Sequence, residues 1–355
     1  MEYLTAKEVA EKWGISQRRV AVLCSEGRVA EAIMLGNMWV IPNTAEKPED
    51  GRTLRYEDKP SSKAKPFLKW AGGKGQLLSE IQRHYPFDEK INKYAEPFVG
   101  GGAVLFDVLN KYDLKEVYIN DINEELINAY RCVKDYPEEL ISKLKIMQEE
   151  YISRDNESRK KYYLEQRNLF NIIKVSHDEV SNIKKATLMV FLNKTCFNGL
   201  YRVNRKGEFN VPMGAYKNPL ICDESNLRNV SQRLQNVIIS CGDYKNSYDF
   251  VDRNTFVYFD PPYRPLTDTA SFTSYTENGF RDKEQKELAE FVKRLDEKGV
   301  KVVVSNSDPK NVDSKDDFFD NIYSCLEVVR VTANRMINSK AKSRGKISEL
   351  LITNC

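Results

Sequence analysis

The sequence contains little histidine, no closely spaced cysteine pair and no long apolar run. Its two histidines, His84 and His177, are far apart, so a zinc site or histidine acid–base chemistry is not expected. Seven cysteines without a Cys-x-x-Cys pair indicate reduced thiols rather than a disulfide framework. The absence of any run of ~18 apolar residues excludes a membrane-spanning helix. The N-terminus also lacks the apolar centre of a secretion signal, which favours a cytoplasmic location.

The composition predicts a folded protein with more than one domain. Its 355 residues exceed what one core usually organises, and 41% hydrophobic residues suffice to bury real cores. Residues 43–66 differ, with prolines and alternating charge, and they predict a linker. The net charge of +3 is too small to indicate a class of partner.

Residues 1–42 carry the signals of two short helices and a hairpin. Thr5 and Glu8 form a capping box before AKEVAEKW, and QRRVAVLCSE follows as a second helix. AIMLGNMWVIP then indicates two strands around a Gly-Asn turn. This order resembles the winged helix-turn-helix of the MerR and excisionase type. That resemblance implies DNA contact through Arg18 and Arg19, and a helical protein-docking module is the alternative.

Residues 67–136 and 236–355 alternate between strand and helix patterns. EVYIND, NTFVYF and VKVVVSNSD are strand patterns, whereas GGAVLFDVLNKY and DKEQKELAEFVKRLDEKG are helix patterns. Residues 137–235 between them are mostly helical, with a hairpin signal in LYRVNRKGEFNVP. The simplest assembly is one α/β domain interrupted by an inserted helical segment.

Two features indicate a nucleoside-containing cofactor. Gly100, Gly101 and Gly102 lie between a strand pattern and a helix pattern, where a ligand can approach the backbone and the helix N-terminus closely. Asp121 ends the next strand pattern, and a carboxylate there can accept both hydroxyls of a ribose. The alternative is an ordinary glycine turn and a helix-capping aspartate.

A third feature, Asp260-Pro261-Pro262-Tyr263, follows the apolar strand FVYF. The prolines donate no backbone hydrogen bond, so the Asp260 carboxylate and the Pro261 carbonyl are left as acceptors beside an aromatic ring. Two acceptors and a ring suit a planar amino group such as the exocyclic amine of adenine. For these four residues alone, a plain strand-ending turn is the alternative.

Five stretches together resemble the DNA adenine methyltransferase (Dam) family: FLKWAGGKGQLL, YAEPFVGGGAVLF, YINDIN, FNGLYRVNRKGEFNVPMGAYKNP and FVYFDPPYRPLTDTASFTSY. Their order is the alpha arrangement of the amino-methyltransferases. The resemblance covers residues 66–355 and implies a Rossmann-like methyltransferase sheet, with residues 137–235 as the target-recognition segment. It implies methyl transfer from S-adenosylmethionine, without a metal, to N6 of an adenine flipped out of double-stranded DNA.

The resemblance also implies roles for single residues. Its cofactor contacts are Trp70, Lys74, Phe98, Gly100, Gly102, Asp121, Asp243, Tyr244 and Asp260, and its catalytic group is Asp260, Pro261, Pro262 and Tyr263. Its DNA contacts are Lys69, Phe197, Asn198, Leu200, Arg202, Asn210, Pro212 and Tyr216.

The implied target is GATC, with Arg202 reading one guanine. Departures from the family pattern at Phe197, Met213 and Ala215 leave a related site such as GGATG open. A run of basic residues between Arg330 and Lys346 is expected to contact phosphates.

Other functions stay open at this point. They are an RNA adenine methyltransferase, a protein glutamine methyltransferase, and a DNA-binding transcriptional regulator with an inactive methyltransferase domain. Asn rather than Asp260 would be expected in a glutamine enzyme, and the intact cofactor and catalytic motifs argue against an inactive domain. A cognate restriction endonuclease is an open functional partner, though not in a stable complex.

Overall fold

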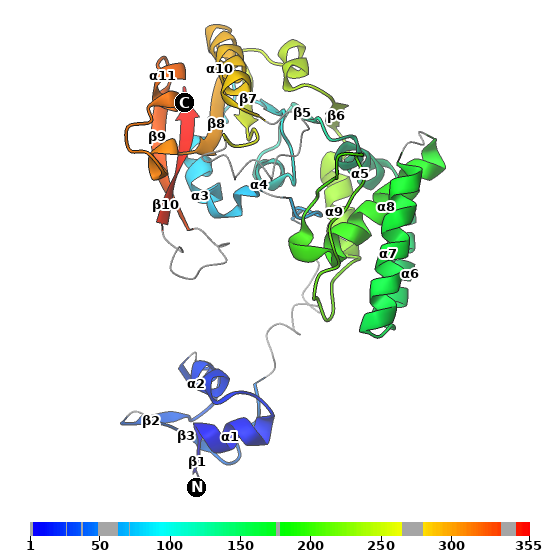
Figure 1. Ribbon diagram of the computed structural model, residues 1–355. Helices are drawn as coiled ribbons and strands as arrows, with labels where there is room; N and C mark the ends of the chain where they lie inside the picture. The colour runs from blue at the N-terminus through cyan, green and yellow to red at the C-terminus, as the bar shows by residue number, and fades with distance from the viewer. Residues whose placement is uncertain are drawn as a thin grey trace. The chain divides into compact units, whose positions relative to one another are not determined.

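The computed structural model describes residues 3–25, 27–36, 38–48, 63–70, 72–174, 178–264, 280–334 and 346–355. The chain divides into two compact units, Met1–Ser61 and Ser62–Cys355 (Figure 1). Each unit has a hydrophobic core of its own.

The N-terminal unit packs two helices, α1 (Ala6–Trp13) and α2 (Gln17–Ser25), on a small antiparallel sheet. The helices and the hairpin formed by β2 (Ile33–Leu35) and β3 (Met38–Pro42) lie where the sequence predicts them. A further strand, β1 (Tyr3–Thr5), pairs with β3 and was not expected. The capping box of α1 is present, as the Thr5 amide donates to the Glu8 carboxylate at 2.8 Å. Whether this unit is a DNA-binding winged helix-turn-helix stays a prediction.

The larger unit contains a seven-stranded sheet within the described residues, and this confirms the mixed α/β class. The strand order is β6 (Val237–Cys241), β5 (Glu116–Asp121), β4 (Lys93–Glu96), β7 (Thr255–Phe259), β8 (Lys301–Ser307), β10 (Lys346–Thr353) and β9 (Glu327–Asn334). The first five strands in this order are parallel, whereas β10 runs antiparallel to both of its neighbours.

Both faces of this sheet are covered, which explains why every residue of β7 is buried. In β7, Phe256 and Tyr258 belong to one core, and Val257 and Phe259 belong to the other. This alternation follows from the two-residue period of a strand.

Helices on the two faces are α4 (Ala103–Lys111) and α5 (Glu124–Asp135) in the first core, and α10 (Asp282–Glu297) in the second. Shorter pieces are η2 (Lys74–Gln76), α3 (Leu78–Ile81), η3 (Gln82–His84), η5 (Tyr244–Asp249), η7 (Pro309–Asn311) and α11 (Phe318–Ile322). Among the described segments, no helix is long and apolar enough to cross a membrane.

The segment between α5 and β6 is mostly helical, as predicted. It contains α6 (Pro137–Ile152), α7 (Asn156–Ile173), α8 (Glu179–Thr195), η4 (Phe197–Gly199) and α9 (Glu224–Leu234). Helix α8 packs against α5, α6 and α7, so the segment shares the core on one face of the sheet (Figure 1). Its role as the target-recognition segment stays a prediction.

The expected two-stranded ribbon in LYRVNRKGEFNVP is a tight turn with one bridge instead. The Gly207 amide donates to the Asn204 carbonyl at 2.9 Å, and Val203 pairs with Phe209. The Asn171 side chain, from α7, bonds both backbone groups of Phe209. These side-chain bonds replace a longer ladder, which an isolated pair of strands rarely sustains in water. Residues 201–210 are called the reading hairpin below.

Candidate functional site

Lys74 and Asp260 form an ion pair at the carboxyl end of β7. The Lys74 ammonium lies 2.6 Å from one Asp260 oxygen and 2.7 Å from the other, and the Lys74 side chain is 5% exposed. The Ser305 hydroxyl donates to the first oxygen at 3.1 Å. Burial raises the pKa of Asp260, whereas the Lys74 charge and the bonds from Lys74 and Ser305 lower it. The same ammonium lies 4.6 Å from the centre of the Tyr263 ring.

The turn that follows Asp260 is held by buried polar side chains. Gln285 donates to the Pro262 carbonyl at 3.1 Å and accepts a hydrogen bond from Asn306 at 3.1 Å. The Tyr263 hydroxyl donates to Glu349, on β10, at 2.7 Å. Since Gln285 and Asn306 are fully buried, the turn is fixed from inside the protein.

Gly100 and Gly102 are required by the geometry of the glycine turn. Both have left-handed backbone, with φ of 47° and 72°. A Cβ at Gly102 would lie 2.5 Å from the Tyr130 hydroxyl oxygen, and one at Gly100 would lie 3.0 Å from Trp70 Cδ1. The turn therefore packs directly against Tyr130 and Trp70, and only glycine fits at these two positions.

Asp121 lies directly against this turn. Its carboxylate accepts the Gly100 amide and the Asn123 amide, each at 3.0 Å. Burial raises the pKa of Asp121, and these backbone bonds lower it. A carboxylate has about four acceptor positions, so Asp121 can accept further hydroxyls. The next residue, Ile122, is 60% exposed.

Phe98 and Tyr244 are stacked, with ring centres 5.3 Å apart and planes 28° apart. Phe280 packs edge-on against Phe98 at 5.9 Å. Asp243 is exposed and begins η5 by accepting the Lys245 amide at 2.8 Å. Phe98 and Tyr244, two predicted cofactor residues, thus contact each other, and the exposed Asp243 lies just before Tyr244.

Several groups around this site were missed by sequence reasoning. Glu96 is 2% exposed, accepts the Tyr94 hydroxyl at 2.7 Å, and has its pKa raised by burial. Its position just before the glycine turn was the available signal. The exposed Ile122, within YINDIN, is a second group that the sequence analysis did not single out. No local pattern marks the others, which are Ser305, Gln285, Asn306 and Glu349.

Lys69 joins the glycine-turn region to the helical insert. The Asn193 side chain bonds both the amide and the carbonyl of Lys69 at 2.8 Å, and it also donates to Gly199. The Lys69 ammonium lies 4.9 Å from the centre of the Tyr216 ring. A Cβ at Gly199 would lie 2.5 Å from Lys69 Cδ, so only glycine allows this close approach.

Phe197, Asn198 and Leu200 follow α8 as an exposed corner. The Phe197 amide donates to the Pro212 carbonyl at 2.9 Å, while the Phe197 side chain is 52% exposed. Asn198 has left-handed backbone, with φ of 56°. Leu200 is half-buried. Because its side chain is exposed, Phe197 is not part of the hairpin core.

Arg202 and Asn210 face each other across the reading hairpin. Arg202 Nε donates to the Asn210 side-chain oxygen at 2.8 Å, and the Asn210 amide donates to the Arg202 carbonyl at 3.1 Å. Arg18 is exposed and Arg19 half-buried on α2, in the separate N-terminal unit.

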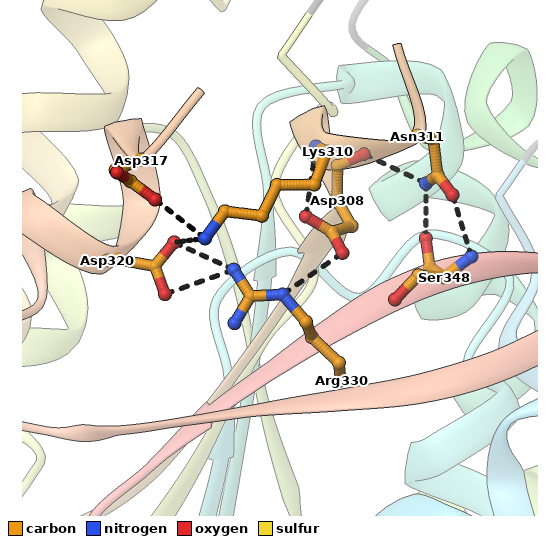
Figure 2. A network of polar contacts seen from close by, with 7 residues as sticks. All are labelled: Asp308, Lys310, Asn311, Asp317, Asp320, Arg330 and Ser348. Carbon is orange, nitrogen blue, oxygen red and sulfur yellow. Dashed lines mark hydrogen bonds and ion pairs between the residues drawn. The ribbon is translucent and has the colours of Figure 1, made fainter. Parts of the chain in front are cut away.

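Arg330, the first residue of the basic run, is paired with acids of the protein, and whether the run contacts phosphates stays a prediction. Figure 2 shows Arg330 bound to Asp308 at 3.2 Å and to Asp320 at 2.7 Å, with Lys310 beside Asp320. Asp308 is 2% exposed, so this arginine neutralises a buried acid. Asp308 caps η7 and Asp320 lies on α11, and no local sequence pattern predicts that either acid pairs with Arg330. The other basic residues, Arg335, Lys340, Lys342 and Arg344, lie outside the described residues, as does the side chain of Lys346.

Residues 70–337 match the family described as D12 class N6 adenine-specific DNA methyltransferase. This chain belongs to that family. The type II methyltransferase M.MjaIII of Methanocaldococcus jannaschii is 52% identical over 294 residues, which are 82% of this chain and 99% of the relative. M1.LlaDCHI of Lactococcus lactis subsp. cremoris is 40% identical over 82% of this chain and 95% of the relative. The DNA adenine methylase of Escherichia coli is 36% identical over 81% and 95%, respectively.

The protein is therefore an adenine-specific DNA methyltransferase. The matched region begins at residue 70, beyond the N-terminal unit. Within the part of the chain that the structure describes, no group of three or more His, Cys, Asp or Glu residues could hold a metal ion.

Proposed function

We propose that this methyltransferase uses S-adenosylmethionine to methylate N6 of an adenine flipped out of double-stranded DNA, within GATC. One observation carries the proposal. The Asp260–Lys74 pair and the Tyr263 ring lie at the end of the central strand β7, and the glycine turn ends the neighbouring strand β4. A site for an amino group and a site for a nucleoside therefore share one edge of the sheet.

The residues around the glycine turn suit S-adenosylmethionine. The turn lies between a strand end and the start of α4, where a ligand can approach the backbone, and Asp121 has acceptor positions for ribose hydroxyls. The exposed Ile122 would cover one face of a base. The implied methionine contacts are Trp70, Lys74 and Phe98, and the implied adenine contacts are Asp243 and Tyr244. When bound, this cofactor supplies an electrophilic methyl group on a sulfonium, and a sulfonium is favoured beside an aromatic ring such as that of Trp70.

Asp260 and Tyr263 would act on the target adenine. The lone pair of its exocyclic amine is delocalised into the ring, so the amine is a poor nucleophile. Hydrogen bonds from its two N–H groups to the Asp260 carboxylate and the Pro261 carbonyl shift electron density toward nitrogen. The Tyr263 ring offers a stacking face for the flipped base. Lys74 and Ser305 hold the Asp260 carboxylate in place for this role.

The test of site recognition uses Arg202→Ala, with Arg205→Ala as a matched control on the same hairpin. Loss of a base contact should reduce discrimination at one base pair by about 1–3 kcal/mol and leave cofactor affinity unchanged. Arg205 is exposed at the turn and should affect all duplexes alike. Methyl transfer into GATC, into GGATG and into singly substituted duplexes measures both effects.

Other outcomes separate the alternatives. Unchanged discrimination in Arg202→Ala would show that residues other than Arg202 recognise the bases. A preference for GGATG, or for RNA of the same sequence, would replace the proposed substrate. Absence of methyl transfer into any of these would favour a regulator with an inactive methyltransferase domain. Two relatives are named type II methyltransferases, so we also propose a cognate restriction endonuclease as a functional partner, not as a stable complex.

We propose in addition that the N-terminal unit binds DNA through α2. The supporting observation is that Arg18 is exposed and Arg19 half-exposed at the start of a short helix that follows the tight turn at Gly14. The double variant Arg18→Ala, Arg19→Ala should weaken binding to long duplexes and spare turnover on short ones at saturating DNA. Equal affinity of both proteins for long duplexes would favour the protein-docking interpretation.

A further inference from the structure

Tyr201 connects the reading hairpin to the glycine turn through Trp70. Its ring, 7% exposed, stacks on Trp70 with centres 5.3 Å apart and planes 24° apart. On its other side, Trp70 closes over the turn, because a Cβ at Gly100 or Gly101 would lie 3.0 or 3.2 Å from it. Tyr201 is also the immediate neighbour of Arg202. One tryptophan therefore contacts both the glycine turn and the reading hairpin.

Glu125, on α5, connects the same two regions a second time. One of its oxygens accepts the Tyr201 hydroxyl at 3.2 Å, and the other pairs with Lys174 at 2.6 Å. The Lys174 ammonium also donates to the Gly207 carbonyl in the hairpin turn at 2.8 Å. Helix α5 begins just after Asp121, which holds the Gly100 amide. The hairpin is thus attached to α5 at its first residue and at its turn.

We infer that Tyr201 is a positioning residue that makes base recognition depend on the cofactor. This rests on the proposed function. A cofactor bound at the glycine turn restrains the turn and Trp70, and the stacked Tyr201 then holds Arg202 in register with the target site. The bound cofactor thus orders part of the reading hairpin before DNA binds. By linkage, the correct DNA site strengthens cofactor binding by the same factor.

The experiment measures dissociation constants of the full-length protein for a GATC duplex and for a singly substituted duplex. Each is measured with and without sinefungin, a non-reactive analogue of S-adenosylmethionine. In the wild type, sinefungin should increase the preference for GATC roughly tenfold, within the usual range of coupling between sites. Tyr201→Ala should reduce that gain to less than about twofold, while the protein still binds sinefungin. A purely structural role would not move this ratio.

Two variants separate the stack from the hydroxyl. Tyr201→Phe keeps the ring and loses the bond to Glu125, so it should retain an intermediate gain. Lys174→Gln weakens the attachment of the hairpin turn and should also give an intermediate gain. Tyr85→Phe is the matched control, because it loses a comparable bond to Asp107, 3.0 Å long, away from the hairpin. It should retain the full gain.

The outcomes are distinguishable. If the wild type binds no sinefungin or shows no preference for GATC, the proposed function fails. If it shows both, but the preference does not depend on sinefungin, the inference is overturned. A Tyr201→Ala protein that retains the full gain also overturns it. If Tyr201→Ala does not fold, full gains in both Tyr201→Phe and Lys174→Gln overturn it instead.

Discussion

Replacing Lys74 by methionine should lower the free energy of unfolding, because the Asp260 charge is then buried without a partner. The pair is largely buried, with side-chain exposures of 5% for Lys74 and 21% for Asp260. Removing one partner of a buried pair costs about 3–5 kcal/mol, and the remaining exposure of Asp260 favours the lower part of that range. Asp260→Asn should cost a similar amount, because it leaves the lysine without its anion. The double variant Lys74→Met, Asp260→Asn keeps no unpaired charge and should lie within about 2 kcal/mol of the wild type.

The loss in Lys74→Met should depend on pH in a defined direction. Burial raises the pKa of Asp260, and the variant removes the Lys74 charge that opposes this. The folded state then retains a proton that the unfolded chain has already released, so its stability falls as pH rises. The stability that Lys74→Met loses relative to the wild type should therefore decrease as the pH is lowered from about 8 to about 5. The double variant, without the carboxyl group, should show no such change.

Urea unfolding followed by circular dichroism, at several pH values, measures these free energies. Methyl transfer into duplex DNA is measured alongside, and the double variant should be folded but inactive. The coupling energy is the double variant's loss minus the two single losses. A coupling near zero, with the double variant as unstable as the sum of the singles, would refute the buried-pair reasoning. So would a Lys74→Met deficit that grows toward acid pH.

Two further predictions concern the glycine turn and Tyr263. Gly102→Ala combines left-handed backbone with a Cβ 2.5 Å from the Tyr130 hydroxyl, so it should lower the free energy of unfolding by about 2–4 kcal/mol. Gly207→Ala, left-handed with nothing within 4 Å, should cost only about 1–2 kcal/mol in the same urea experiment, and equal losses would contradict the steric argument. Glu349→Ala removes the acceptor of the Tyr263 hydroxyl and should raise KM for DNA about tenfold, whereas Glu349→Gln should raise it much less. Steady-state methylation kinetics test this, and an unchanged KM in the alanine variant would show that Tyr263 is oriented without Glu349.

The local features of this methyltransferase were readable from its sequence. The capping box at Thr5, the turn at Asn204, the apolar strand before Asp260 and the glycine turn all lie where short-range patterns predict them. Each depends on neighbours a few residues away, through backbone conformation and the period of apolar side chains. The mixed α/β class followed from the alternation of such patterns.

Contacts between distant residues were decided only by the tertiary structure. Lys74, on η2, and Asp260, just after β7, are 186 positions apart, and only the tertiary structure brings them into contact. The ion pairs of Arg330 with Asp308 and Asp320 also form only in the folded structure. The stack of Tyr201 on Trp70 likewise forms only when the helical insert packs on the sheet domain. Composition and periodicity determine which face of an element is buried, but the partner of a buried charge or ring depends on which elements the sheet places side by side.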